Sequence, residues 1–177
     1  MSILENGKDD YGKIRPCTLD DLNEIVRLQE IVYENMPDKN MLSITERDEI
    51  EESLKLDKCY CAEVDGEMIA YSMLVAPRIS YRNTGTYLGY DEERLKKTAT
   101  MDLSLVKPGH RGHHMQRRMI KIRLDDAKKL GAEEVLSTVD PANSHSLNNI
   151  EGSGFKYVTT KVIYGGLTRN IMRFTFE

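Results

Sequence analysis

The sequence predicts an α/β fold of the mixed (α+β) kind, in which a central sheet carries helices on both faces. Apolar residues recur at helical spacing in two segments, 22–32 and 115–130. Two apolar runs flank the dipeptide Asp65-Gly66, which favours a two-residue hairpin turn. A further apolar run, 98–106, leads directly into a short loop and the second helical segment. The predicted element order is β-α-α-β-β-β-α-β-α-β-β.

The first half of the chain is expected to supply a strand, two helices and a hairpin. We expect residues 1–11, which are mostly polar, to form a loose N-terminal arm. Thr18 stands before two aspartates, a pattern typical of a helix N-cap, and Pro37 ends that helix. The expected elements are a strand at 13–17, helices at 18–34 and 45–56, and strands at 59–64 and 68–75.

The second half begins with residues 78–97, which are too long for a hairpin turn and indicate a functional loop. Gly131 is well placed to end the helix that starts near residue 115. The expected elements are a strand at 98–106, a helix at 115–130, a strand at 134–139, a helix at 144–152, and strands at 155–164 and 169–174. We expect one domain over 1–177.

Composition narrows the class of protein. The chain has 177 residues, a formal net charge of -4 and three cysteines, which we interpret as reduced thiols. The acidic balance argues against nucleic-acid binding by bulk electrostatics. No stretch approaches the roughly 20 apolar residues of a membrane helix, and no signal peptide is apparent. We therefore expect a cytoplasmic protein that contacts no membrane.

The segment 106–116 combines a strand end, a short loop and a helix start. The first N–H groups of a helix have no helical partner, and the helix dipole places partial positive charge there. Gly112 lets the backbone approach a ligand closely, and Arg111 and Arg117 can donate charge-assisted bonds to phosphate oxygens. The segment therefore predicts a phosphate-binding site.

This segment resembles the coenzyme A motif of the GNAT superfamily of N-acetyltransferases, V-x-P-x-x-R-G-x-G-x-G/A. The residues that match in register are Val106, Pro108, Arg111 and Gly112. Further along, Asn143 followed by Gly154-Phe155 resembles the second motif of the family at the usual separation. Together with the element order, the resemblance covers about residues 13–176.

The resemblance implies acetyl-CoA as co-substrate and a set of residues that contact it. Backbone groups of Ser104, Leu105 and Val106 would pair with the pantetheine arm, and loop N–H groups would hold the pyrophosphate. Asn143 would bond the pantetheine or acetyl end, and Arg117 would reach the phosphate-bearing ribose. The implied contacts are Ser104, Leu105, Val106, Arg111, Gly112, His113, His114, Met115, Gln116, Arg117 and Asn143.

The family pattern has glycine where His114 stands. A helical backbone there would leave the N–H free to serve, whereas a positive φ would weaken the site. The general-acid tyrosine of many members falls here at Ile150. Asp102 is the candidate base, Tyr157 and Tyr164 are candidate acids, and a backbone N–H near Leu105 or Val106 is the candidate that polarises the carbonyl.

The implied activity is transfer of acetyl from acetyl-CoA to a primary amine of a small molecule, amino acid or peptide, by direct attack. The acidic helix 45–56 and the tyrosine-rich loop 81–90 would select the acceptor. One alternative is a non-catalytic acyl-CoA-binding module. The other is a nucleic-acid-binding module that uses the basic helix 111–123. A homodimer through the final hairpin is also compatible with the sequence.

Several polar residues and two cysteines also fit purely structural or solvent-facing positions. His110 and His113 are expected to face solvent rather than to hold a metal, and no metal site is expected. Lys121 and Arg123 fit the solvated face of an amphipathic helix. Asn143 also fits a turn and helix N-cap. The two cysteines of the strand 59–64 are expected to be half-buried and without chemical role.

Overall fold

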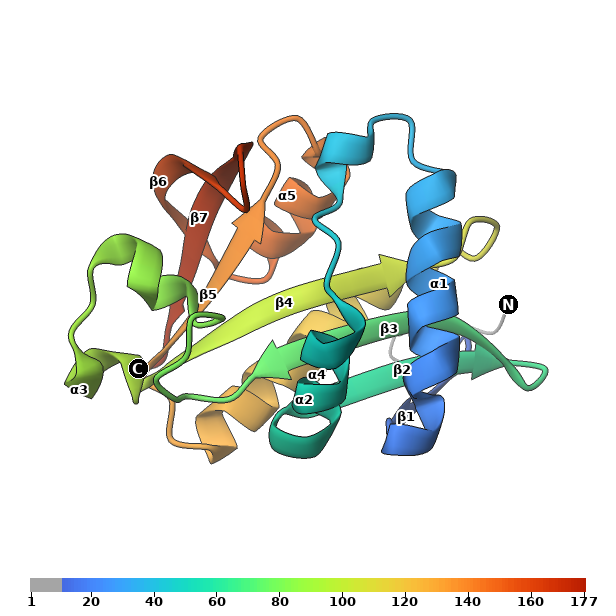
Figure 1. Ribbon diagram of the computed structural model, residues 1–177, viewed down its shortest axis with the longest axis horizontal. Coiled ribbons are helices and arrows are strands. Elements are labelled where there is room, and N and C mark those ends of the chain that lie inside the picture. Colours follow the sequence, from blue (N-terminus) through green and yellow to red (C-terminus); the bar gives the residue numbers. More distant parts are fainter. Residues whose placement is uncertain (1–10) are drawn as a thin grey trace.

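The computed structural model describes residues 11–177, whose strands form one mixed sheet of seven in the order β1-β2-β3-β4-β5-β7-β6 (Figure 1). The strands are β1 Lys13–Pro16, β2 Lys58–Val64, β3 Glu67–Val75, β4 Thr98–Val106, β5 Glu134–Val139, β6 Lys156–Ile163 and β7 Leu167–Thr175. Neighbouring strands are antiparallel except for β4 and β5, which are parallel. The expected arm at 1–11 lies outside the described residues except for Tyr11.

Helices cover both faces of the sheet, as predicted. The elements are α1 Leu22–Glu34, α2 Arg47–Leu56, α3 Glu92–Leu95, α4 Met115–Lys129 and α5 Ser144–Gly152, with 3-10 turns at Leu19–Asp21, Lys39–Met41 and Thr84–Leu88. In Figure 1, α1 and α2 lie in front of the sheet and α4 lies behind it. The short α3 and the 3-10 turns were not predicted, because three to five residues are too few to show a helical period. No helix of the described chain is long and apolar enough to cross a membrane.

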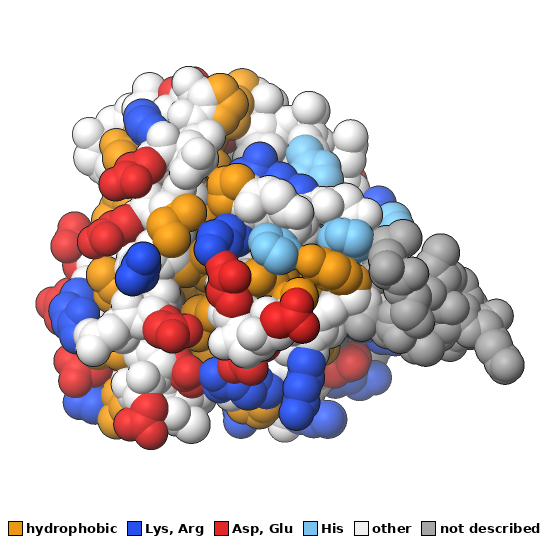
Figure 2. All heavy atoms as spheres, turned by 90° about the vertical axis from the view of Figure 1, so that its right-hand side faces the viewer, with side chains coloured by type: hydrophobic (Ala, Val, Ile, Leu, Met, Phe, Trp, Pro, Cys, Tyr) orange, Lys and Arg blue, Asp and Glu red, His pale blue; other side chains and the backbone are white. Residues whose placement is uncertain are grey.

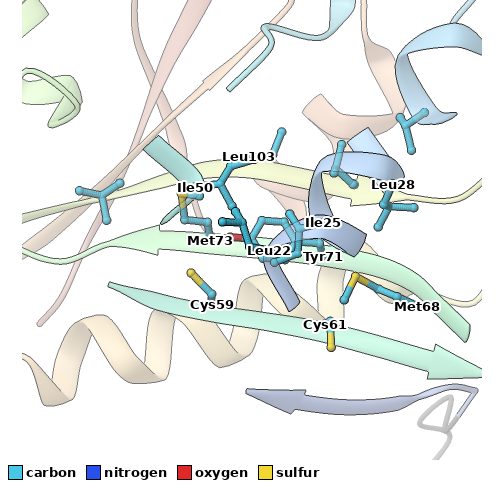
Figure 3. Close-up of a cluster of buried hydrophobic side chains, with 13 residues drawn as sticks. Leu22, Ile25, Leu28, Ile50, Cys59, Cys61, Met68, Tyr71, Met73 and Leu103 are labelled. Atoms are coloured by element: carbon cyan, nitrogen blue, oxygen red, sulfur yellow. The ribbon is translucent and has the colours of Figure 1, made fainter. Parts of the chain in front are cut away.

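The core under α1 and α2 joins both helices to β2, β3 and β4. Ile25 of α1, Ile50 of α2 and Leu103 of β4 are among its buried members, and Figure 3 shows them converging over the strands. Cys59 and Cys61 belong to this cluster and are buried, so the expectation that they are half-buried is corrected. Both point to the helix-covered face of β2, where apolar contact replaces solvent.

The parallel pair β4–β5 is short. Thr98–Met101 pairs with Glu134–Ser137, and β4 has no β5 partner beyond that point. The two strands diverge from there, as the ribbon shows (Figure 1). The rest of β4, residues 102–106, keeps its pairing with β3 on the other side. One edge of β4 is therefore open along its second half.

A β-bulge interrupts β4 where the strands diverge. Leu74 pairs with Met101 and Ser72 pairs with Ser104, so β4 has one residue more than β3 in this interval. Met101 packs in the cluster on the α4 side, whereas Leu103 packs in the cluster under α1 and α2. Two residues of equal parity thus face opposite sides. Side-chain alternation is reset at Asp102, which decides what this residue can contact.

Candidate active site

A cavity of about 730 Å³ opens where β4 and β5 diverge. Its walls are the segment after α1, the loop before α4, the end of β5 with the start of α5, and the turn between β6 and β7. The predicted site residues on its wall are Asp102, Ser104, Val106, Arg111, Gly112, His114, Met115, Gln116, Asn143 and Tyr164. The predicted residues that do not line it are Leu105, His113, Arg117 and Tyr157. The structure therefore brings most of the predicted residues together around one space.

The open edge of β4 presents specific backbone groups to this cavity. The N–H of Lys107 donates to the carbonyl of Ile69 on β3 at 2.7 Å. Backbone direction alternates along an antiparallel pair, so Leu105 also bonds to β3, whereas Ser104 and Val106 point their N–H and C=O groups the other way. This explains why Ser104 and Val106 line the cavity and Leu105 does not. Leu105 is thus not available as a backbone ligand, contrary to the prediction.

The loop before α4 has the backbone geometry of the anion site that the sequence predicts. The first-turn N–H groups of α4 have no helical partner, and the N-cap residue, His114, makes no side-chain cap bond. The first turn contains no acidic residue. Gly112, at φ 86°, adopts a conformation that glycine tolerates best. These features leave a cluster of N–H donors and a positive dipole end facing the cavity.

His114 has φ 54° and ψ 24°, in the left-handed region. Of the two possibilities open from the sequence, the structure shows the positive φ. A residue with a Cβ is destabilised there by about 1–2 kcal/mol. The site therefore stores backbone strain at the position where the family pattern has glycine.

Tyr11 packs against the histidines of this loop. Its hydroxyl lies 2.6 Å from His110 Nδ1, and its ring stacks on His113 with centroids 3.7 Å apart. Arg118 of α4 donates to the Tyr11 carbonyl. Both histidines are half-buried, so they face solvent only in part, and Tyr11 packs against this loop. On the face drawn in Figure 2, histidine side chains lie near the surface beside basic ones.

Helix α5 is fixed to α4 by polar contacts. Asn143 Oδ1 accepts from the N–H of Ser146 at 3.2 Å, so Asn143 is the N-cap of α5 as well as a cavity residue. Gln116 Nε2 donates to Ser146 Oγ at 3.2 Å. Arg117 Nε donates to Asn149 Oδ1 at 3.0 Å, which directs this side chain to α5 rather than to the cavity. The proposed ribose contact of Arg117 stays a prediction.

Asp102, the candidate base, faces α2 because of the bulge. Its carboxylate lies 3.3 Å from Nη2 of Arg82, and its side chain is 29% exposed. The expectation that Asp102 shares a face with Ser104 is therefore wrong, although both line the cavity. Burial raises the pKa of Asp102, and the charge of Arg82 opposes that shift. A carboxylate with a raised pKa is a stronger base than an ordinary aspartate.

Arg82 was not singled out from the sequence. It is buried, and it donates to Ser53 Oγ at 2.7 Å and to the Glu49 carbonyl at 3.1 Å, both on α2. Asp57, whose side chain is fully buried, lies 3.9 Å from it. Arg82 thus ties the 78–97 loop and α2 to Asp102. Its position inside a long irregular segment gave no periodic signal that it would be buried.

The two tyrosines proposed as acids have different positions. Tyr164 lines the cavity, its hydroxyl lies 3.0 Å from Thr138 Oγ1, and its ring meets Tyr87 edge to face at 6.0 Å. Burial, and then the charge of Asp102, raises the pKa of Tyr164. Tyr157 is 57% exposed on the edge strand β6, away from the cavity wall. Of the two, only Tyr164 is placed to reach a bound substrate.

Arg123 contradicts its expected place on a solvated helix face. It is 2% exposed, and its guanidinium donates to the carbonyls of Met73 at 3.1 Å and Met119 at 3.3 Å. Burial lowers the pKa of Arg123 to about 10. It also lines the cavity. The signal that predicts this burial is its spacing of four residues from Met119 and Ala127 and of eight from Met115, which are all buried.

No group of three or more His, Cys, Asp or Glu side chains between Tyr11 and Glu177 is placed to hold a metal ion. No protein-family model matches the sequence, and a search of curated proteins finds no significant match.

Solved structures, in contrast, match over nearly the whole chain. YncA of Salmonella typhimurium, assigned as an acetyltransferase and solved with its cofactor acetyl-CoA, has a TM-score of 0.70 at 16% identity, with 93% of this chain and 94% of that one covered. A ribosomal-protein-alanine N-acetyltransferase from Brucella melitensis has a TM-score of 0.70 at 15% identity, covering 93% and 99%. A GNAT-family acetyltransferase from Streptococcus pneumoniae has a TM-score of 0.70 at 14% identity, covering 93% and 99%.

These identities are low, so the likeness shows the fold and not the activity. The chain has the fold of the GNAT acetyltransferases, a mixed sheet whose parallel central pair diverges around a cavity.

Proposed function

We propose that this protein transfers an acetyl group from acetyl-CoA to a primary amine of a small molecule, amino acid or peptide by direct attack. The observation that carries the proposal is the open edge of β4. Ser104 and Val106 aim unpaired backbone groups into a cavity that reaches the uncapped start of α4. A molecule with amide groups in its middle and a diphosphate at one end fits this arrangement, and acetyl-CoA has that design.

Two regions of the cavity bind different parts of acetyl-CoA. The amide groups of the pantetheine arm extend the sheet along Ser104 and Val106, as an added strand does. The pyrophosphate lies at the N-terminus of α4, where N–H groups and the helix dipole favour anions. Arg111, which is exposed at the cavity mouth, adds a charge-assisted bond. Asn143, whose Oδ1 caps α5, also lines the cavity.

The chemistry begins with an amine that has lost its proton, because only a free lone pair attacks the thioester. Asp102 accepts that proton, directly or through a water molecule. The lone pair forms a C–N bond to the acyl carbon, and the C–S bond then breaks with its electron pair moving to sulfur. Tyr164 is the candidate acid for the thiolate. Tyr157 is left without a role because it lies outside the cavity.

The acceptor side of the cavity fits an amine on a partly apolar body. Glu49 and Asp102 supply negative charge, and Met36 and Met41 supply apolar wall. Tyr81 donates to Glu49 at 2.7 Å, and this hydrogen bond raises the pKa of Tyr81 to about 12. An α-amino group of a peptide is among the amines considered, since one structural neighbour is named for action on a ribosomal-protein alanine.

Titration calorimetry with acetyl-CoA, followed by a thiol-release assay over a panel of amines, tests the proposal. We expect saturable binding of one acetyl-CoA per chain and release of coenzyme A with at least one amine class. Binding of acetyl-CoA without release of coenzyme A on any amine supports the non-catalytic alternative. The presence of Ile150 at the position of the family's tyrosine favours that alternative. Absence of acetyl-CoA binding contradicts both the acetyltransferase proposal and the non-catalytic alternative.

The nucleic-acid alternative has less structural support. Arg117 is bonded to α5, Arg118 to the Tyr11 carbonyl, and Arg123 is buried. The basic segment therefore does not form one free cationic face. Salt-sensitive binding to mixed-sequence DNA or RNA at low ionic strength is the result that would restore this alternative.

A further inference from the structure

Glu49 lines the cavity, and two neutral donors hold its carboxylate in place. Its Oε2 accepts from the Tyr81 hydroxyl at 2.7 Å, and its Oε1 accepts from the Glu46 N–H at 3.0 Å. Its ion pair is long, because Nε of Arg82 lies 4.0 Å from Oε2. An ionised carboxylate accepts about four hydrogen bonds, so Glu49 has lone pairs left for further donors. A ligand in the cavity is therefore able to bond to this side chain, which is 21% exposed.

Acidic side chains outnumber basic ones in the ion-pair network to which Glu49 belongs. Among residues 11–177, this network joins four carboxylates and two guanidinium groups, those of Glu49, Glu52, Asp57, Asp102, Arg78 and Arg82. The closest contacts are Arg78 to Asp57 at 2.9 Å and Arg82 to Asp102 at 3.3 Å. The carboxylate of Glu49 is the most distant from its guanidinium partner. The network is short of positive charge, so a cationic ligand stabilises it.

Two of the four carboxylates, those of Glu49 and Asp102, line the cavity. Both lie within 4.0 Å of the guanidinium of Arg82, so they are close neighbours. In the proposed function, Asp102 takes the proton of the reacting amine. That reaction needs no second acid, yet Glu49 supplies one at short range. A ligand with two amino groups on a short spacer fits both carboxylates.

The arginines of the cavity wall are not placed to bind a carboxylate beside the reacting amine. Arg82 is paired with Asp102, and its Nη1 donates to two further protein acceptors. Arg169 is paired with Asp140 at 3.3 Å, and its other terminal nitrogen donates to a backbone carbonyl. The other two arginines of the wall lie at the phosphate end and on α4, which is behind the sheet (Figure 1). A free amino acid would therefore leave its carboxylate without a cationic partner.

An apolar wall borders the two acids. Met36 and Leu42 line the cavity and pack against the core cluster that contains Ile50 of α2 and Leu103 of β4. These two core residues directly follow the acids in the sequence. Methylene groups between two amines are stabilised by burial against such a wall, whereas polar groups there lose water without gaining a partner. The wall favours an aliphatic spacer.

We propose that the acceptor is an aliphatic diamine and that Glu49 is the specificity-determining residue that binds its second, non-reacting ammonium group; this rests on the proposed acetyl transfer. The reacting amine, with its lone pair free, forms a C–N bond to the acyl carbon and gives a proton to Asp102. The C–S bond breaks with its electron pair moving to sulfur, which takes a proton from Tyr164 or solvent. The other amine keeps its charge at Glu49, so the products are a monoacetylated diamine and coenzyme A.

The first test compares three acceptors of equal length in the wild type. They are diaminobutane with an amine at each end, butylamine, and aminobutanoate with a carboxylate opposite its amine. Release of coenzyme A at saturating acetyl-CoA gives kcat and KM for each acceptor. We expect kcat/KM to be about 10- to 100-fold higher for diaminobutane than for butylamine, as for a hydrogen bond between charged groups. Aminobutanoate should have the lowest value, because the two acids repel its carboxylate.

The second test removes the charge of Glu49. Glutamine has the same length and is also suited to the capping position that Glu49 occupies in α2. We expect Glu49→Gln to lower the preference for diaminobutane over butylamine by about 10- to 100-fold. The loss should lie in KM for diaminobutane rather than in kcat, because the second amine is bound equally before and during the reaction. Glu30→Gln, the same change at an exposed position of α1 outside the cavity wall, should keep the wild-type preference.

The ratio between two acceptors isolates the recognition of the second amine. Burial, and also the charge of Glu49, raises the pKa of Asp102. Removal of the Glu49 charge therefore changes the base as well. That change acts alike on every acceptor, so it cancels in the ratio.

The outcomes separate this proposal from the proposed function. No release of coenzyme A with any amine of the wider panel overturns the acetyl transfer and the diamine proposal with it. Release with other amines, but with diaminobutane no better than butylamine, overturns the diamine proposal alone, and this comparison needs no variant. A preference for diaminobutane that Glu49→Gln retains overturns the role of Glu49.

Discussion

Replacement of His114 by glycine is expected to stabilise the protein, although the residue lies in the proposed cofactor site. His114 holds φ 54° at the N-cap of α4 and makes no side-chain cap bond. Its side chain is exposed, so replacing the imidazole with glycine removes few packing contacts. The change removes the Cβ and keeps the N–H.

The magnitude follows from two opposing effects. A left-handed backbone costs a residue with a Cβ about 1–2 kcal/mol, and glycine escapes that cost. Glycine also gives the unfolded chain more freedom, which lowers stability by about 0.4–1 kcal/mol. The net gain is roughly 0.5–1 kcal/mol, which corresponds to about 1–4 °C in Tm for a chain of this size.

Thermal unfolding and urea titration of the wild type, His114→Gly and His114→Ala provide the assay. Alanine removes the imidazole but keeps the strained φ, so His114→Ala should stay within about 0.5 kcal/mol of the wild type. Equal stabilisation by alanine and glycine would assign the effect to the imidazole and refute the strain argument. Destabilisation by glycine would refute it as well. The Kd for acetyl-CoA should be unchanged or lower in His114→Gly, because every N–H donor remains.

Three further changes test the charged groups of the cavity, with Lys121→Met as the common control. Arg82→Met leaves Asp102 without its guanidinium partner, whereas Asp57 keeps Arg78, and the change should lower the free energy of unfolding in urea by about 3 kcal/mol; a loss no larger than that of Lys121→Met contradicts this. Asp102→Asn should lower kcat by about 10²–10⁴. Because the pKa of Asp102 is raised, the base protonates as pH falls through a value above the roughly 4 of an ordinary aspartate, and wild-type activity is lost there; an unchanged pH profile in Asp102→Asn excludes it as the base. Arg111→Met should weaken acetyl-CoA binding by about 10- to 100-fold at low salt and less at high salt; calorimetry showing no loss removes the phosphate contact.

The regular elements were predictable because their signals are local. The dipeptide Asp65-Gly66 gives a hairpin, and both residues have positive φ in the structure. The helical spacing from Met115 to Ala127 gives α4 with its buried stripe. The junction between β4 and α4 followed from motif and order together. These features depend on a few neighbouring residues, so the sequence shows them.

The features that organise the cavity depend instead on distant partners. No local pattern around Asp102 predicts a bulge, because the bulge depends on how β4 pairs with Met73 and Leu74 of β3. Arg123 carries a charge that indicates solvent, and its burial depends on the Met73 carbonyl 50 residues away. Tyr11 contacts His110, which is 99 residues away in the sequence. The polar composition of the N-terminal segment does not predict this contact. Long-range pairing, rather than residue type, decided each of these positions.

The most direct test of acetyl-CoA binding along the open edge of β4 is residue-resolved amide hydrogen exchange with and without acetyl-CoA. The amides of Ser104 and Val106 should exchange more slowly in the complex, together with those of the loop 111–116. The amide of Leu105, which already bonds to β3, should change little. Binding of acetyl-CoA with no slowing at Ser104 or Val106, or with slowing spread equally over Leu105, would contradict the account.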